Sequence, residues 1–492
     1  MLSKIRENQL NSMITNIIMI IIVFVAIILY FANNPLKHSK EFRIRCFWNW
    51  FPLGLTYAFM YMGRYNLTVA TGAMGDLITK QNFGDIFGIG AVTYGLAFLI
   101  NGPLTDKMGG KKAILLGTAG AILANALMGV SVYCVLNGII DKSMIVPAFI
   151  VLYSVNMYFQ SFGAVSVIKV NSSWFHIKER GIQGGVFGTL IALGLFYAFN
   201  WGDIIVKASK AKLPEHMDLI ESALRFLIGS ANAKMDQTWY VFFIPAIILA
   251  FFFVLLVIIV KDHPSQAGFE DFDLGDASND LNEESVIALY KRLLANPVIL
   301  TIAFIEFCSG VIRQSIMHWY KIFVSQNPAK LAQGASFFID NWGLLLCFAG
   351  IFGGFVAGYI SDKLFQSRRG PSAVFLYAAM FVFSVLMYFT LEQNQILLGI
   401  AVLLMSLCVI GVHGMLSGAA TMDFGGKKAA ATTTGLVDGF VYLGTGLQGF
   451  VLGRLTSMDW SYWPLFMIPF TIVGLVLSVK IWKAFPDRGA KS

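Results

Sequence analysis

The chain has 492 residues, of which 57% are hydrophobic and 13% are charged, and its formal net charge is +8. A soluble globular protein of this size could not bury so much apolar surface, and the mean hydropathy of +0.69 supports the same exclusion. The positive charge does not indicate nucleic-acid binding, because the Lys and Arg residues sit in short loops between apolar runs. The composition therefore predicts an all-α polytopic membrane protein whose surroundings are a lipid bilayer.

Apolar runs of about 20 residues, the length that crosses a bilayer core of ~30 Å, recur along the whole chain. We predict one extra N-terminal span and then two sets of six. The predicted ranges are 13–32, followed by 46–72, 86–105, 113–135, 144–170, 184–200, 239–260, 298–323, 338–360, 372–391, 396–421, 433–456 and 462–482. The first span lacks a convincing small-residue cleavage site, so it is predicted to be a membrane anchor rather than a signal peptide.

Lys and Arg in the short loops predict the orientation, because cytoplasmic loops are enriched in these residues. The basic loops are 34–45, 106–112, 171–183, 361–371, 422–432 and the C-terminal tail. The opposite short loops hold only Lys80, Lys142 and Lys330. We therefore predict a cytoplasmic C-terminus, and the extra span places the N-terminus outside. The expected location is the inner membrane of a cell, and the expected state is a monomer.

Two longer loops organise the chain. The loop at 201–238 is predicted to lie outside and contains "PEHMDLIESALRFLIGSA", which favours a short surface helix, and the loop at 261–297 is acidic and predicted to be cytoplasmic. The predicted domains are an extra N-terminal transmembrane helix with a basic linker (1–45), an N-terminal six-helix half (46–260), the acidic central loop (261–297), and a C-terminal six-helix half with the tail (298–492).

An internal repeat supports the two halves. "GPLTDKMGGKK" follows the second span of the first half and "GYISDKLFQSRRG" follows the second span of the second, each with Gly four residues before Asp. These loops lie at cytoplasmic helix ends and contain Asp106, Lys107, Asp362 and Lys363. The aspartates can interact with the N-terminus of a neighbouring helix, and the lysines with residues of opposite charge. We expect these four residues to form a conformational latch.

Arg64 and Arg313 lie inside the first span of each half, and the interval between them equals that between Lys178 and Lys427. Inserting an arginine at the centre of a membrane helix costs about 2.5–3.5 kcal/mol. Each is two or more turns from a helix end, which argues against snorkelling to the interface. Because a guanidinium binds phosphate oxygens in a bidentate fork and stays charged when desolvated, we favour two arginines that face one cavity and bind a dianionic phosphate. A structural ion pair, with Glu306 or Asp438, is the alternative.

Tyr57 and Tyr61 share a helix face with Arg64 through their i, i+4, i+7 spacing. Together with Tyr94 and Tyr442 they are candidate hydrogen-bond donors to a ligand, and aromatic packing explains each equally well. Asp438 either tunes substrate choice through its charge or makes a packing hydrogen bond. For Glu306 we favour a structural role, as one member of a buried pair. Packing or hydrogen bonding is favoured for His413 and His318.

Motifs for other chemistry are not found in the sequence. It contains no P-loop, HExxH, paired CxxC or GxSxG, and its five cysteines lie within or beside apolar segments. We therefore predict that the protein is not an enzyme and that it holds no cofactor, metal ion or disulfide framework.

From about residue 46 to 485 the chain resembles the major facilitator superfamily, and within it the organophosphate:inorganic phosphate antiporters, which include bacterial glycerol-3-phosphate and hexose-phosphate transporters. The resemblance rests on "YAFMYMGRYNL", "FQSFGAVSVIKVNSSWFHIKERG", "SDKLFQSRRGPSA" and "GKKAAATTTGLVDGFVYLG". It implies two pseudo-symmetric six-helix bundles and exchange of a phosphorylated metabolite for inorganic phosphate by alternating access. It also implies that Arg64 and Arg313 bind the phosphate and that Tyr57, Tyr61 and Tyr94 line the site.

The sequence departs from the glycerol-3-phosphate members of that family. They carry a Lys where Phe98 aligns here and a His where Ile191 aligns, and Asp438 is added in this chain. These differences leave the organic group on the phosphate open. Two other functions also stay open: a non-transporting membrane sensor of hexose phosphate, and a proton-coupled carrier of another small solute that uses Asp438, Glu306 or His413.

Overall fold

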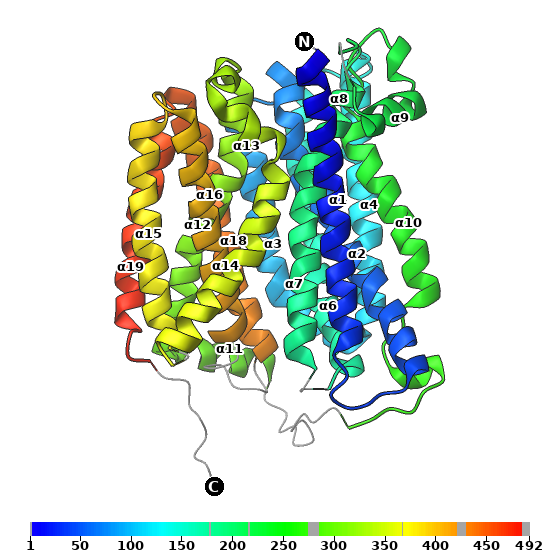
Figure 1. The fold of residues 1–492 in the computed structure, drawn as a ribbon, viewed down its shortest axis with the longest axis vertical. Helices are drawn as coiled ribbons and strands as arrows, with labels where there is room; N and C mark the ends of the chain where they lie inside the picture. The colour runs from blue at the N-terminus through cyan, green and yellow to red at the C-terminus, as the bar shows by residue number, and fades with distance from the viewer. Residues whose placement is uncertain are drawn as a thin grey trace. The chain divides into compact units, whose positions relative to one another are not determined.

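The computed structural model describes residues 2–176, 179–214, 217–273, 285–366, 368–420 and 430–484, and these residues form helices without strands (Figure 1). The α-helices are α1 (Leu2–Ala32), α2 (Lys40–Met74), α3 (Lys80–Met108), α4 (Gly110–Leu136), α5 (Ile145–Gln160), α6 (Phe162–Trp174), α7 (Arg180–Phe196), α8 (Gly202–Ser209), α9 (Leu219–Ile228), α10 (Tyr240–Ile259), α11 (Val286–Ala295), α12 (Pro297–Gln326), α13 (Ser336–Asp340), α14 (Trp342–Tyr359), α15 (Arg369–Thr390), α16 (Gln395–His413), α18 (Ala430–Met458) and α19 (Tyr462–Lys480). The predicted all-α fold is confirmed.

Twelve helices in the described part of the chain are long and apolar enough to cross a membrane. They correspond to the thirteen predicted spans except the one at 46–72. That segment does form a continuous helix, the 35-residue α2, which at 1.5 Å per residue is long enough to span. Its interior holds Asn49, Arg64 and Asn66, and such polar residues lower its hydropathy. The least apolar of the predicted spans is thus α2, which holds Arg64.

Several spans are interrupted where the chain changes helix type. Only Ser161 separates α5 from α6, and the two together make one span. A π-helical stretch, Tyr197–Trp201, joins α7 to α8, so the fifth span of the first half is longer than predicted. Beyond α8, the short α9 confirms the helix predicted within the 201–238 loop. Lys178 and Lys427 of the predicted repeat lie outside the described residues.

The chain divides into two compact units. The first comprises Met1–Leu77, Thr105–Asp276 and Asn341–Cys347, and the second comprises Ile78–Leu104, Ala277–Asp340 and Phe348–Ser492. The first unit therefore holds α1, α2, α4–α10 and the first residues of α14. The second unit holds most of α3, the rest of α14, and α11–α13, α15, α16, α18 and α19.

In the first unit, three of the predicted basic segments meet at one end of the helices. Arg45 donates to the carbonyl of Ile259 (2.8 Å), and the backbone N–H of Lys111 donates to Asp262 (2.7 Å). The indole of Trp174 donates to the carbonyl of Lys261 (3.0 Å). The start of α2, the start of α4 and the end of α6 are therefore held together against the end of α10, as a shared membrane side requires.

The extra helix α1 packs against α7. Its C-terminal carbonyls are satisfied by Arg43, which donates to the carbonyls of Phe31 (2.8 Å), Asn33 (2.9 Å) and Tyr30 (2.5 Å). A cation at a helix C-terminus also interacts favourably with the helix dipole. The linker predicted to be basic therefore caps the helix that precedes it.

In the second unit, glycines line the contact between α3 and α18. A Cβ added to Gly84 would lie 2.3 Å from the carbonyl oxygen of Gly449, and one added to Gly453 would lie 3.2 Å from the Cα of Gly84. Small residues allow membrane helices to approach this closely. At the same contact Arg454 forms two bonds with Asp85, at 2.8 and 3.3 Å.

Candidate functional site

Arg64 lies well inside α2, and only 3% of it is exposed. Its Nε donates to Oε1 of Gln160 (3.1 Å), and its guanidinium carbon lies 4.6 Å from the ring centroid of Tyr61. A cation over a ring contributes about 2 kcal/mol when both are desolvated. The amide at its edge and the ring at its face hold the guanidinium plane in one orientation.

A network of buried amide side chains continues behind Gln160. Gln160 donates to Oδ1 of Asn156 (3.0 Å), Asn125 donates to the same oxygen (2.9 Å), and Asn66 donates to Asn125 (2.6 Å). The network ties α2, α4 and α5 together around the arginine. Sequence reasoning missed these four residues, although an amide inside an apolar span is a signal that could have found them.

Tyr57 and Tyr61 stand on the same side of the first unit as Arg64. Their rings are 5.6 Å apart and nearly perpendicular. A Cβ on Gly163 of α6 would come within 2.8 Å of the Tyr57 ring, and one on Gly194 of α7 within 3.0 Å of the Tyr61 ring. Glycines on neighbouring helices thus make the space that the two tyrosines occupy.

Arg313 lies in α12 and is half-buried. Helix α18 comes very close at this level, since a Cβ on Gly310 would overlap the carbonyl of Val441. Asp438 of α18 is within electrostatic range of Arg313 and accepts a hydrogen bond from the hydroxyl of Ser417. The structure thus shows a hydrogen bond of the kind expected from packing, and the effect of Asp438 on substrate choice stays a prediction.

Glu306 lies seven residues before Arg313 on α12 and is completely buried. Its Oε2 lies 2.7 Å from Nδ1 of His413. The structural pair favoured for Glu306 and the hydrogen bond favoured for His413 are therefore one and the same contact. Asp438 is within electrostatic range of both residues. Asp438 is thus close both to Arg313 and to the Glu306–His413 pair, whereas the contacts described above around Arg64 are made by the Gln160 amide and the Tyr61 ring.

Tyr94 of α3 and Tyr442 of α18 are in contact, with ring centroids 4.2 Å apart. Phe98 completes the cluster at 4.9 Å from Tyr94 and 6.2 Å from Tyr442. Phe98 is thus packed against two of the predicted site residues.

The predicted binding residues are divided between the two units. Arg64, Tyr57 and Tyr61 are gathered in the first unit, and the remaining predicted residues, Arg313, Tyr94, Asp438 and Tyr442, belong to the second. That the two groups act on one ligand stays a prediction.

The predicted latch residues make separate local contacts. Asp106 lies 2.8 Å from Nζ of Lys169, and Asp362 lies 2.9 Å from Nη1 of Arg369. Lys107 and Lys363 are exposed. Both aspartates are more than half exposed, and exposed ion pairs contribute about 0–1 kcal/mol, which suits contacts that form and break.

No group of three or more His, Cys, Asp or Glu side chains in the described ranges could hold a metal ion. The five cysteines are free thiols, and all but Cys134 are buried.

A family model described as Major Facilitator Superfamily matches residues 53–449. The chain is similar to a glycerol-3-phosphate transporter of Bacillus subtilis (strain 168), with 25% identity over 471 residues that cover 90% of this chain and 93% of that protein. It is 23% identical to a probable hexose phosphate transport protein of Chlamydia muridarum, covering 91% and 92% of the two chains. It is also 23% identical to the membrane sensor protein UhpC of Salmonella typhimurium, covering 94% and 97%.

These relatives are consistent with the resemblance to organophosphate:phosphate antiporters on which the sequence prediction rests. The match to the family model extends over most of the chain and includes α12 with its arginine as well as α2. The helical fold and the number of candidate spans agree with it. The protein is a multi-pass membrane protein that belongs to the major facilitator superfamily, a family of transporters and not of enzymes.

Proposed function

We propose that the protein is a secondary transporter that exchanges a phosphorylated metabolite, of the sugar phosphate or glycerol phosphate type, for inorganic phosphate by alternating access. The observation that carries the proposal is Arg64, a buried guanidinium whose orientation is fixed by Gln160 and Tyr61. An oriented guanidinium is suited to bidentate contact with phosphate oxygens. The names of the relatives, which include transporters of glycerol 3-phosphate and hexose phosphate, support the same class of substrate.

Arg313 supplies the second cation for the phosphate in this proposal. Asp438, within electrostatic range of Arg313, adds a negative charge to its surroundings. A substrate whose hydroxyl groups donate hydrogen bonds would gain from such a carboxylate, whereas a second phosphate group would be repelled. We therefore favour a sugar monophosphate over a bisphosphate as the organic partner.

Obligate exchange follows from the charge of the empty site. Even with Asp438 near Arg313, two guanidinium groups in a low-dielectric cavity make reorientation of the empty carrier costly, and a bound phosphate lowers that cost. Loaded carriers then reorient readily and empty carriers do not. Asp106 and Asp362, next to the exposed Lys107 and Lys363, would release and re-form their ion pairs as the carrier changes state. In this proposal the carrier acts as a monomer in the inner membrane of a cell.

The exchange is tested with purified protein in liposomes. Labelled phosphate should enter vesicles that contain unlabelled phosphate or glucose 6-phosphate and should not enter empty vesicles. Arg64→Lys and Arg313→Ala should abolish phosphate binding, whereas Arg292→Lys, at an exposed arginine of α11, should retain it. Rapid uptake into empty vesicles would disprove exchange, and phosphate binding that survives either site substitution would disprove the site.

A hexose phosphate sensor is the second candidate, because the match to the sensor UhpC extends over 94% of this chain. A sensor binds its ligand and shows negligible flux. The liposome measurement therefore separates the two candidates: binding of glucose 6-phosphate without any exchange, under conditions where both arginines are needed for binding, would favour sensing.

A further inference from the structure

Helix α9, between α8 and α10, exposes its apolar residues and buries its charged residues, which is the reverse of a surface helix in a soluble domain. Leu219 and Phe226 are each 86% exposed and Leu227 is 76% exposed. Glu221 and Arg225 are almost completely buried, at 5% and 3%. Since Leu219 and Phe226 are seven residues apart, they lie on the same helix face, turned away from the charged pair.

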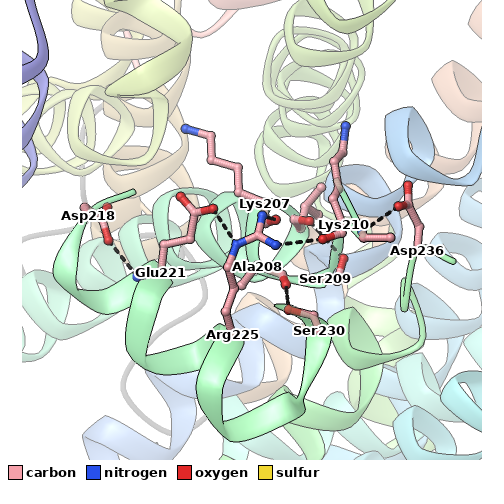
Figure 2. Close-up of polar contacts among 11 residues, drawn as sticks. Lys207, Ala208, Ser209, Lys210, Asp218, Glu221, Arg225, Ser230 and Asp236 are labelled. Atoms are coloured by element: carbon pink, nitrogen blue, oxygen red, sulfur yellow. Dashed lines mark hydrogen bonds and ion pairs between the residues drawn. The ribbon is translucent and has the colours of Figure 1, made fainter. Parts of the chain in front are cut away.

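The charged pair fixes this orientation (Figure 2). Nε of Arg225 donates to Oε1 of Glu221 (3.0 Å), and its Nη1 and Nη2 donate to the carbonyls of Lys210 (2.7 Å) and Lys207 (2.5 Å). These carbonyls lie at the C-terminal end of α8, where backbone acceptors have no partner within the helix. Arg225 therefore satisfies the end of a transmembrane span, and Glu221 balances its charge.

A further contact holds the C-terminal end of α9 against α8, because the hydroxyl of Ser230 donates to the carbonyl of Ala208 (2.5 Å). The helix itself is well capped: the carboxylate of Asp218 accepts from the backbone N–H of Glu221 (2.6 Å) as the N-cap, and Gly229 ends the helix in the left-handed conformation with φ of 68°. With the polar face and the C-terminal end held against α8, the apolar face points outward.

The level of α9 in the membrane is set by its neighbours. The backbone N–H of Gln237 donates to the carbonyl of Ser209 (2.7 Å), which joins the end of α8 to the start of α10. Trp239 and Tyr240 follow at once, and the Trp239 ring packs on Tyr133 at the end of α4 (5.1 Å). Tryptophan and tyrosine gather at the membrane–water interface. The carbonyls that hold α9 therefore lie at the interface, next to the lipid-exposed surface of α10.

We propose that α9 is an interfacial helix whose apolar face, formed by Leu219, Ile220, Phe226 and Leu227, inserts into the surface of the lipid bilayer. A ten-residue helix is too short to be stable in water on its own. The polar face gains stability from α8, and insertion removes the apolar face from water. Helix α10, which packs against α8, also exposes apolar residues, among them Ile247 and Phe251.

The proposal is tested by nitroxide labels on the full chain in lipid nanodiscs, with Cys134→Ser as background because the other four cysteines are buried. Phe226→Cys and Leu219→Cys report the apolar face at its two ends. Lys142→Cys, in the exposed turn before α5, is the aqueous control. Collision with dissolved oxygen should exceed collision with a water-soluble nickel chelate at positions 226 and 219, and the order should reverse at position 142.

Two results would overturn the proposal. Labels at 226 and 219 that behave like the label at 142 would show that the face is in water. Immobile labels with low access to both collision partners would show that protein, from a second copy or another chain, covers it. Two label positions keep the test informative if one substitution impairs folding. Because the readout does not involve transport, it is independent of the proposed function.

Discussion

Two buried arginines of the first unit have different kinds of partner. Arg225 is paired with Glu221 and caps the carbonyls of α8, so its contacts are those of a structural residue. Arg64 has the amide oxygen of Gln160 at its Nε and the Tyr61 ring at its face. A neutral amide orients a guanidinium without cancelling its charge, and the charge is what an anionic ligand requires.

Gln160→Leu should therefore weaken phosphate binding while the protein still folds. A hydrogen bond to a charged group contributes about 1.5–3 kcal/mol, which corresponds to about a 10- to 100-fold rise in the Kd for phosphate. Isothermal titration of the purified protein measures this change. Gln395→Leu removes an equally buried glutamine at the start of α16 and should leave the Kd unaltered. An unchanged Kd in folded Gln160→Leu protein would contradict the role given to Gln160.

At the scale of elements, small and polar residues in the spans mark where helices meet. Asn66, Asn125 and Asn156 join three helices of the first unit by side-chain hydrogen bonds. In the second unit the contact between α3 and α18 depends on shape, because Gly84 and Gly449 allow the two backbones to approach closely. Lipid gives helices no hydrophobic reason to associate, so hydrogen bonds and close packing supply the attraction.

Gly84→Ala should destabilise the contact between α3 and α18, because its new Cβ would lie 2.3 Å from the Gly449 carbonyl oxygen. Overpacking of this kind costs about 1–3 kcal/mol. The control is Gly102→Ala in the same helix, where a Cβ would meet nothing within 4 Å. At Gly102 the alanine makes the unfolded chain less flexible, so the stability of the protein should stay the same or rise by about 0.5–1 kcal/mol. Thermal unfolding of both variants in detergent measures the difference, and equal melting temperatures would refute the steric argument.

At the scale of the molecule, the distribution of charge predicts how the chain is oriented in the membrane. In the first unit the start of α2, the start of α4 and the end of α6, each beside a predicted basic loop, meet at the end of α10 through contacts of Arg45, Lys111 and Trp174. One membrane side therefore collects them, as the enrichment of cytoplasmic loops in Lys and Arg predicts. The loop before α5 holds a single lysine, Lys142, and follows the opposite end of α4.

Cysteine labelling in intact cells tests this orientation. Lys142→Cys should react with a membrane-impermeant maleimide from outside. Lys107→Cys and Lys363→Cys, at exposed positions at the end of α3 and just after α14, should react only after the cells are opened. The same pattern on a chain shortened by residues 1–33 would show that the extra helix is not needed for the orientation. Labelling of position 107 in intact cells would reverse the predicted topology.

The sequence by itself determined the class of protein and the extent of most spans, because a hydropathy of this size and apolar runs of bilayer length admit few other structures. It also singled out Arg64, since a charge inside a span is conspicuous in one dimension. It could not show that Gln160 orients that arginine or that Glu306 meets His413, because those partners lie 96 and 107 residues away along the chain. Nor could it show that α9 turns its charges inward. The packing of the helices decides which polar groups form hydrogen bonds with one another. The periodicity of one helix shows which of its faces is buried, but it does not identify the helix that packs against that face.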